Sequence, residues 1–523
     1  MKHIFLYGPP GAGKSSVGNA LSERLRLPFI DFDLEIVKFA GKTIPQIMDE
    51  QGESAFRDLE TETLKRAADE SPRVIALGGG ALLREENRRY AEERGQVVFL
   101  ETKAETLVER LRKEQNQRPL LSGNLEEKLQ ALLEQRKEHY DSFMIRVSQA
   151  GQSNHEFQKT PEQVAFEIQQ KLNLLSVHSP DGDIYDVIIQ SGGFDSLGDF
   201  MRECKLGNPV AVIADETVAD YYAEGALKSI ERAGYDVHAI TFPASETSKN
   251  LDTIMKLWQG MLKIGLDRKS MVVALGGGVV GDMAGFAAST FMRGIDWIGV
   301  PTTLLAMVDS SLGGKTGFDL PEGKNLIGSF HSPKLVLADP HMLDTLLEVE
   351  FISGMAEVVK HGIISDPELF ALCGRGLDWV KNNLDEIVKR AMAVKIRIIE
   401  EDPYEKGLRA SLNLGHTVGH AVELVSHFQL RHGEAVAIGM VAEAKLAERL
   451  TVAGKGLSDA VAESLSALGL PIQIPKELPH QEIIRAMRMD KKKNAKAIRF
   501  ALPAEIGRIE LVDVTDLESV LED

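Results

Sequence analysis

The stretch GPPGAGKS, residues 8–15, decides the fold of the first part of the chain because it fits the pattern G-x-x-x-x-G-K-[ST]. It follows a short apolar segment, 4–7, that predicts a strand, and it opens an amphipathic segment, 14–25, that predicts a helix. Glycines let backbone N–H groups converge on phosphate oxygens at the positive end of a helix. We therefore expect a nucleoside triphosphate site, with Lys14 reaching the β- and γ-phosphates and the Ser15 hydroxyl ligating Mg²⁺.

Strands and helices continue to alternate outward from this loop. Apolar segments at 74–77 and 97–100 predict strands, and the segments 101–112, 125–140 and 161–172 predict helices. Such alternation is typical of an α/β fold, with a parallel sheet covered by helices on both faces.

The pattern breaks and then restarts after a turn-rich stretch. Further strands are expected at 187–190, 210–214, 237–241, 271–275 and 298–300. From about residue 340 long amphipathic helices dominate, for example 377–401 and 436–450, with a short strand pair near 497–502 and 509–512. We expect a P-loop α/β domain over 1–173, a linker over 174–183, a Rossmann-like α/β domain over 184–339 and a mainly helical domain over 340–523.

Composition narrows the class of protein. At ~150 residues per domain, 523 residues indicate roughly three domains. Lys and Arg number 60 against 78 Asp and Glu, and this net charge of −18 disfavours a nucleic-acid binder, which needs a basic face. Cys204 and Cys373 cannot form a disulfide framework, and no apolar run reaches the ~18 residues of a membrane span. We expect a cytoplasmic protein with small-molecule ligands and neither nucleic-acid nor membrane partners.

Candidate residues for binding the substrate that accepts the phosphoryl group lie on separate segments of the first domain. Asp31 and Asp33 end the apolar run FIDFD, and the triglycine 78–80 follows a predicted strand. Three arginines, Arg57, Arg118 and Arg136, carry the planar fork that suits carboxylates and phosphates, although a single arginine is more often a solvated surface charge.

Together with the phosphate loop, these residues resemble shikimate kinase over residues 1–173. The resemblance implies that Asp31 lies near the acceptor hydroxyl and Mg²⁺ as a catalytic residue beside Lys14. It implies that shikimate is held by Asp33, Arg57, Gly79, Gly80 and Arg136. It implies that ATP is held by Gly11, Gly13, Lys14, Ser15, Ser16 (where the family usually has Thr) and the lid residue Arg118, with Arg110 or Arg112 near the adenine.

A metal constellation stands in the C-terminal half. His416 and His420 have the i, i+4 spacing that places both imidazoles on one face of a helix, and His432 and Glu357 complete a candidate set. Two histidines and one glutamate with an open position suit a catalytic Zn²⁺, whereas histidines satisfied in the core are the alternative. Spacing alone allows His420 to be a ligand as well.

A glycine-rich loop and a set of cations precede this constellation. GGGVVG at 276–281 lies between a predicted strand and a predicted helix, although it is not a strict dinucleotide fingerprint. Lys315, within MVDSSLGGKTG at 307–317, and the pair Lys324 and Asn325 indicate the capture of an anion, with an ordinary loop lysine as the alternative.

Residues 184–523 resemble 3-dehydroquinate synthase, through the run 309–317, Glu357 with Lys360, and the segments 413–420 and 432–434 in the family's order. The resemblance implies Zn²⁺ (or Co²⁺) on Glu357, His416 and His432, with His420 relaying protons. It implies that the catalytic and substrate-binding residues are Arg293, Asp309, Lys315, Lys324, Asn325, Lys360, Lys395, Arg409, Asn413 and His420, with Lys491 or Lys492 closing over the substrate. It implies an NAD site lined by Asp215, Glu246, Lys249, Gly277, Gly278, Asp282, Thr302, Thr303, Lys315 and Lys324.

The two resemblances together imply a bifunctional enzyme of the shikimate pathway, which leads to chorismate and the aromatic amino acids. One half would phosphorylate shikimate with ATP, and the other would convert 3-deoxy-D-arabino-heptulosonate 7-phosphate to 3-dehydroquinate with release of phosphate, as a homodimer formed through that half. The alternatives are a related sugar-phosphate cyclase fused to another small-molecule kinase, an NAD- and metal-dependent polyol dehydrogenase, and a regulatory nucleotide-binding module.

Overall fold

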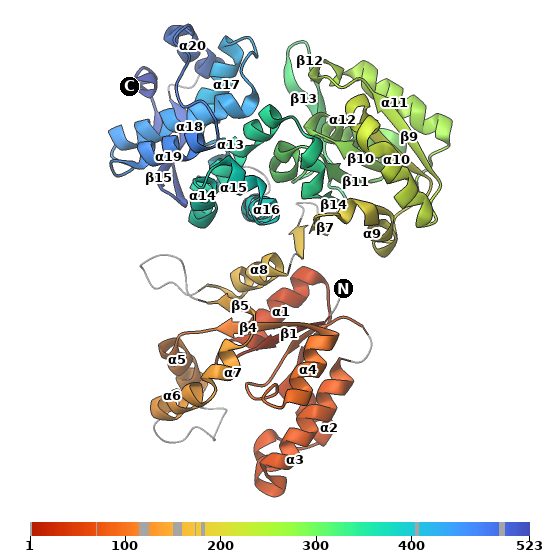
Figure 1. The fold of residues 1–523 in the computed structure, drawn as a ribbon, viewed down its shortest axis with the longest axis vertical. Helices are drawn as coiled ribbons and strands as arrows, with labels where there is room; N and C mark the ends of the chain where they lie inside the picture. The colour runs from red at the N-terminus through yellow and green to blue at the C-terminus, as the bar shows by residue number, and fades with distance from the viewer. Residues whose placement is uncertain are drawn as a thin grey trace. The chain divides into compact units, whose positions relative to one another are not determined.

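The chain divides into two compact units, Met1–Leu174 and Leu175–Asp523 (Figure 1). The computed structural model describes residues 3–68, 71–114, 125–149, 159–172, 174–178, 184–402, 407–490 and 497–522. Within these ranges no helix is both long enough and apolar enough to cross a membrane.

The first unit is built on a five-stranded parallel sheet in the order β2-β3-β1-β4-β5. Its central strand contributes Ile4 and Leu6 to one hydrophobic core and Phe5 and Tyr7 to another. This alternation explains the fold, because a strand that is apolar on both faces requires helices on both faces. The strands are β1 (His3–Tyr7), β2 (Phe29–Asp31), β3 (Val74–Ala76), β4 (Gly95–Glu101) and β5 (Ile145–Ser148).

The helices of the first unit follow the predicted alternation, with two differences. The single helix expected over 125–140 is divided at Arg136, whose backbone is not helical (φ −102°, ψ 5°). Three further helices lie where no helix was predicted: α2 and α3 between β2 and β3, and α4 between β3 and β4. The helices are α1 (Lys14–Leu25), α2 (Phe32–Ala40), α3 (Ile44–Ala67), α4 (Glu85–Arg94), α5 (Ala104–Glu114), α6 (Leu125–Gln135), α7 (Lys137–Asp141) and α8 (Pro161–Lys171).

The second unit contains a seven-stranded sheet in the order β6-β7-β14-β11-β10-β8-β9, parallel except for β6. Part of the expected linker is strand β6, because Leu175 and Val177 alternate into the core and pair with β7. The strands are β6 (Leu175–His178), β7 (Ile184–Ile189), β8 (Val210–Asp215), β9 (Val237–Phe242), β10 (Met271–Gly276), β11 (Asp296–Pro301) and β14 (Leu335–Ala338).

A hairpin that the sequence did not predict lies between β11 and β14. Its strands, β12 (Lys315–Leu320) and β13 (Gly323–Phe330), pair antiparallel and carry Lys315, Lys324 and Asn325, for which no strand was predicted. The helices of this α/β part are α9 (Leu197–Glu203), α10 (Glu216–Arg232), α11 (Leu251–Ile264) and α12 (Gly278–Thr290).

The rest of the second unit is mainly helical, as expected. The predicted strand pair near its end is antiparallel and consists of β15 (Ile498–Glu505) and β16 (Arg508–Val514). The helix expected over 377–401 is two helices, α15 and α16, and the helix expected from residue 436 begins at His432. The helices are α13 (Glu348–Ser365), α14 (Pro367–Cys373), α15 (Leu377–Lys381), α16 (Leu384–Glu401), α17 (His416–Val425), α18 (His432–Arg449), α19 (Leu457–Ala467) and α20 (His480–Asp490).

Candidate active sites

The phosphate loop joins β1 to α1 and is shaped by glycines in the left-handed region. Gly11 has φ 79° and Gly13 has φ 72°, conformations that other residues adopt only at a cost. Lys14 Nζ donates to the carbonyl oxygens of Gly8 (2.9 Å) and Pro9 (3.0 Å), so the ammonium lies over the loop. The loop therefore has the curvature and the cation that a triphosphate site requires.

Two side chains contact this loop, Arg110 of α5 and Gln149, which directly follows β5. Arg110 Nη1 donates to the Gly11 carbonyl (3.3 Å) and to Gln149 Oε1 (2.8 Å), while Gln149 donates to the Ala12 carbonyl. Arg110, a candidate for the adenine contact, thus contacts the phosphate loop directly. Arg112 forms an exposed ion pair with Glu126 instead. Gln149 belongs to no motif, and the sequence analysis missed it.

The Ser15 hydroxyl, the expected Mg²⁺ ligand, and the Asp31 carboxylate, expected near the acceptor hydroxyl, lie in direct contact. Ser15 Oγ donates to Asp31 Oδ2 at 2.5 Å. Asp31 is also the N-cap of α2, where its other oxygen accepts the Leu34 N–H at 3.3 Å. Capping holds the carboxylate at the carboxyl end of β2, where it faces the start of α1.

The glycine turn 78–80 brings the expected acceptor residues together. A Cβ on Gly78 would lie 2.9 Å from Asp33 Oδ1, and one on Gly80 would lie 2.8 Å from Arg57 Nη1. Arg136 Nη1 donates to the Gly79 carbonyl at 2.8 Å. A Cβ on Gly79 would lie 3.1 Å from Cδ of Pro10 in the phosphate loop. One carboxylate and two guanidinium groups therefore surround a turn that borders the phosphate loop.

Three residues that the sequence analysis missed support this turn. Glu60 accepts from Arg57 at 2.7 Å, and burial raises the pKa of the Glu60 carboxyl although the Arg57 guanidinium lowers it. The hydroxyls of Tyr140 (2.9 Å) and Tyr7 (3.3 Å) both donate to the Gly79 carbonyl. Arg118, the expected lid residue, lies outside the described residues.

In the second unit, Glu357, His416 and His432 converge from three helices. Glu357 Oε1 lies 3.6 Å from His416 Nε2 and 3.7 Å from His432 Nε2. This oxygen is buried and accepts no hydrogen bond among the described residues. Tetrahedral ligands at ~2.0–2.1 Å from Zn²⁺ lie roughly 3.4 Å apart, so the three atoms have the spacing of metal ligands.

His420 lies beside this set without belonging to it. Its ring centroid is 5.1 Å from that of His416 and 5.9 Å from that of His432. Among the described residues, His420 belongs to no cluster whose ligand atoms lie close enough together to hold a metal ion.

Two ion pairs, one of them fully buried, adjoin the metal set. Lys360 pairs with Glu357, and Lys395 pairs with Asp309. Burial opposes ionisation of Asp309, but the Lys395 ammonium outweighs it and lowers the pKa of Asp309 to about 2. Asp309 and Glu357 also approach His361 closely enough to suggest a second cation position. Lys395 already pairs with Asp309, and Glu357 belongs to the first set, so we assign no second ion there.

A further carboxylate, Glu423, contacts both a proposed metal ligand and a proposed substrate-binding lysine. Glu423 Oε2 lies 3.3 Å from His432 Nδ1, and Oε1 accepts from Lys324 Nζ at 3.3 Å. Burial disfavours the charged form, but the contacts with His432 and Lys324 lower the pKa of Glu423 to about 2. No sequence motif marked this residue.

The glycine loop after β10 forms a narrow cradle. A Cβ on Gly277 would lie 3.1 Å from Thr303 Cγ2, and one on Gly278 would lie 3.1 Å from Ser310 Oγ. Gly277 is the N-cap of α12, so a phosphate group can approach the helix N-terminus closely. This arrangement fits a dinucleotide.

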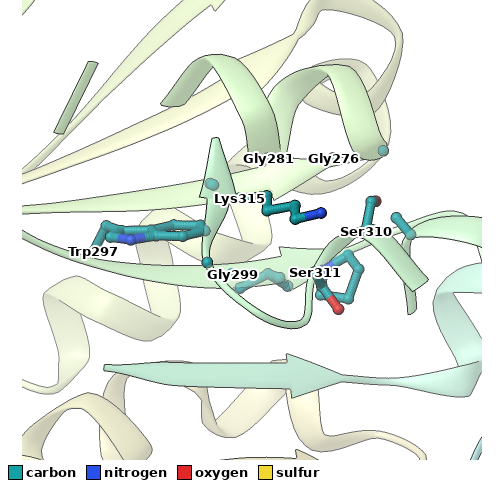
Figure 2. A pocket seen from close by; sticks show the side chains of 13 residues that line it. Gly276, Gly281, Trp297, Gly299, Ser310, Ser311 and Lys315 are labelled. Carbon is teal, nitrogen blue, oxygen red and sulfur yellow. The ribbon is translucent and has the colours of Figure 1, made fainter. Parts of the chain in front are cut away.

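Lys315 enters the same region from the hairpin. Figure 2 shows its side chain extending along a cavity, lined also by Gly276 and Gly281, toward Ser310. Lys249 Nζ donates to Asp282 Oδ2 (2.6 Å) and Asn325 Oδ1 (2.5 Å). Lys249 therefore connects α12, which begins at the cradle, with strand β13 of the hairpin.

The remaining expected residues are less closely tied to the two sites. Asp215 caps α10 by accepting the Val218 N–H at 2.9 Å. Arg409 is buried, and a Cβ on Gly313 would lie 3.3 Å from its Nη2.

Among the described residues, neither Arg293 nor Asn413 forms a hydrogen bond to another expected site residue. Glu246 lies 3.9 Å from Lys324. Thr302 is buried, and its N–H donates to the Gly276 carbonyl oxygen at 3.0 Å. Lys491 and Lys492 lie outside the described residues.

Comparisons with known proteins divide the chain at the same place. Residues 10–173 match the shikimate kinase family, and residues 239–353 and 354–493 match the N-terminal and C-terminal families of 3-dehydroquinate synthase. The 3-dehydroquinate synthase of Nostoc punctiforme is 46% identical over 351 residues, covering 66% of this chain and 96% of that protein.

Two solved structures resemble the second unit. A 2-deoxy-scyllo-inosose synthase complexed with carbaglucose-6-phosphate, NAD⁺ and Co²⁺ is 26% identical, with a TM-score of 0.61, covering 66% of this chain and 99% of that one. A 2-epi-5-epi-valiolone synthase from Streptomyces hygroscopicus subsp. jinggangensis 5008, with NAD⁺ and Zn²⁺ bound, is 28% identical, with a TM-score of 0.58, covering 64% and 94%.

Proposed function

Because the chain belongs to the 3-dehydroquinate synthase family and carries a shikimate kinase domain at residues 10–173, we propose that it is a bifunctional enzyme of the shikimate pathway. The kinase unit transfers the γ-phosphoryl group of ATP to shikimate. The synthase unit converts 3-deoxy-D-arabino-heptulosonate 7-phosphate to 3-dehydroquinate and phosphate.

The kinase proposal depends on the convergence of Asp33, Arg57 and Arg136 on a turn beside the phosphate loop. The two guanidinium groups suit the carboxylate of shikimate, and Asp33 accepts hydrogen bonds from its hydroxyls. Asp31 orients the attacking hydroxyl, and Lys14 stabilises the charge that spreads over the transferring phosphoryl group. Mg²⁺, when bound at Ser15, neutralises charge on the β- and γ-phosphates.

The synthase proposal depends on the spacing of Glu357 Oε1 from the two histidine Nε2 atoms. Glu357, His416 and His432 would hold Zn²⁺ or Co²⁺, which would supply a Lewis acid for the substrate hydroxyl. The glycine cradle would hold NAD⁺, which would supply the hydride chemistry. Lys315, Lys324 and Arg409 hold the departing phosphate. Asp309, Lys360 and Lys395 contact the substrate hydroxyls, and His420 moves a proton beside the metal.

Two other reactions fit part of this geometry. A polyol dehydrogenase uses a metal and NAD⁺ but needs no anion-binding cations, which the hairpin and Arg409 supply. A cyclase for another sugar phosphate shares the fold, yet the chain is 46% identical to a 3-dehydroquinate synthase against 26–28% for the other two cyclases.

The experiment that separates these reactions is product analysis of the purified chain with 3-deoxy-D-arabino-heptulosonate 7-phosphate and catalytic NAD⁺. The proposed synthase releases one phosphate per 3-dehydroquinate without accumulating NADH. Net NADH formation would indicate a dehydrogenase, and turnover only of another sugar phosphate would indicate a different cyclase.

We also propose a homodimer through the synthase unit, in the cytoplasm. Strand β13 exposes Leu326 (57%), Ile327 (41%) and Phe330 (67%), an apolar surface of the kind that subunit interfaces cover. Cys204 and Cys373, the two cysteines of the sequence, form no disulfide, which fits a reducing compartment. Light scattering on the purified chain tests the assembly: the mass of a dimer supports it, and a monomer at micromolar concentration would contradict it.

A further inference from the structure

We propose that Glu423 is a positioning residue for the metal centre and that it links this centre to the anion-binding hairpin. The inference rests on the proposed synthase function and deepens it. Glu423 stands on α17 seven residues after His416, so both side chains lie on nearly the same face of the helix. From there it reaches His432 on α18 and Lys324 on β13.

The two proposed histidine ligands share one arrangement. Each directs Nε2 toward Glu357, at 3.6 Å for His416 and 3.7 Å for His432. Each has an acceptor at Nδ1: the Leu414 carbonyl oxygen at 3.1 Å for His416, and Glu423 Oε2 at 3.3 Å for His432. An acceptor at Nδ1 holds the proton on that nitrogen and leaves the Nε2 lone pair for a metal.

The acceptor differs between the two histidines, and this difference makes the proposal testable. A backbone carbonyl cannot be removed by substitution, whereas a carboxylate can. A charged acceptor also raises the basicity of the ring more than a neutral one does. Glu423 therefore holds the ring of His432 in place and strengthens its bond to the metal.

The second carboxylate oxygen of Glu423, Oε1, contacts Lys324 of the hairpin. Lys324 Nζ donates to it at 3.3 Å and lies 4.7 Å from the centroid of the Phe428 ring. These contacts hold a long, half-exposed side chain over the site before substrate arrives. Loss of Glu423 should therefore weaken substrate binding as well as metal binding, because Lys324 loses its anchor.

The test uses the full chain stripped of metal and measures the Zn²⁺ dissociation constant by competition with a chromophoric chelator. Glu423→Gln keeps an oxygen acceptor but loses the charge, and we expect Zn²⁺ affinity to fall ~10-fold. Glu423→Leu removes the acceptor, and we expect a fall of ~100-fold, the upper range for such contacts. The matched control is Glu350→Gln, which removes an exposed carboxylate paired with Arg431, next to His432 in sequence, and should change the affinity less than twofold.

Zn²⁺ affinity within twofold of the unsubstituted chain for both Glu423 variants would overturn the positioning role. An equal loss in the Glu350→Gln control would also overturn it, since general charge near the site would then explain the effect. At saturating Zn²⁺, the KM of Glu423→Leu for the sugar phosphate should rise at least threefold, and an unchanged KM would refute the link to Lys324. If the unsubstituted chain neither binds Zn²⁺ nor forms 3-dehydroquinate, the proposed function fails instead.

Discussion

At the scale of single residues, Lys14 separates the two activities most directly. Its ammonium lies over the phosphate loop of the first unit, and the metal set belongs to the second. Lys14→Ala removes a charge that stabilises the transition state, so shikimate phosphorylation should fall at least ~10²–10³-fold. Release of ADP with shikimate and release of phosphate from the sugar phosphate are measured on the same preparation. The second rate should stay unchanged, and an equal fall in both would indicate that the substitution disturbs the whole protein.

The histidine pair in the second unit gives another residue-level prediction. His416→Ala removes a ligand whose Nε2 faces Glu357, so Zn²⁺ should be lost and cyclisation should stop. His420→Ala leaves the three ligands in place, so Zn²⁺ affinity should fall at most ~10–100-fold. Zinc content of the purified variants decides between the two roles. Complete metal loss in His420→Ala with retention in His416→Ala would reverse the assignment.

Residues within motifs could be predicted from the sequence, whereas their supporting contacts could not. The phosphate-loop pattern marked Ser15, whereas the roles of Asp31 and of Glu357 with the two histidines followed from the family motifs they belong to. Spacing alone left His420 open as a ligand. Glu423, Glu60 and Gln149 were missed because a carboxylate or an amide has no signature of its own. Their roles arise only when separate elements meet.

At the scale of elements, the packing of α17 against α18 holds His416 and His432 together. A Cβ on Gly439 of α18 would lie 1.9 Å from the Gly415 carbonyl oxygen, immediately before His416. Gly439→Ala should therefore separate the helices, lower the unfolding free energy by ~1–3 kcal/mol and weaken Zn²⁺ binding.

The control for this prediction is Gly454→Ala, because a Cβ there has no atom within 4 Å. Thermal unfolding and Zn²⁺ titration of both variants provide the measurement. If Gly439→Ala is as stable as the control and binds Zn²⁺ as tightly, the close approach of these helices is not what holds the metal set.

Elements with clear periodicity were predicted well, and irregular ones were not. Helix α1 has the expected bounds, since its apolar residues recur at helical spacing. No strand was predicted over the hairpin β12–β13, because Leu326, Ile327 and Phe330 do not alternate into a core. Strand β6 was assigned to the linker because its turn-rich surroundings concealed two buried residues, Leu175 and Val177.

At the scale of the whole molecule, the division at Leu174 predicts that the kinase unit works alone. Two hydrophobic cores, both made of residues of this unit, pack against its sheet. Residues 1–174 should therefore fold and phosphorylate shikimate at a rate within about threefold of the full chain. Circular dichroism establishes folding, and ADP release measures activity. A folded but inactive fragment, beside an active full chain, would show that the synthase unit is required for phosphorylation.

The central claim is that one chain carries two complete and separate active sites. The most direct measurement assays both reactions on three preparations: the unsubstituted chain, Lys14→Ala and His416→Ala. We predict shikimate 3-phosphate and 3-dehydroquinate from the unsubstituted chain, only 3-dehydroquinate from Lys14→Ala, and only shikimate 3-phosphate from His416→Ala. Formation of only one product by the unsubstituted chain, or loss of both products on either substitution, would contradict two separate active sites.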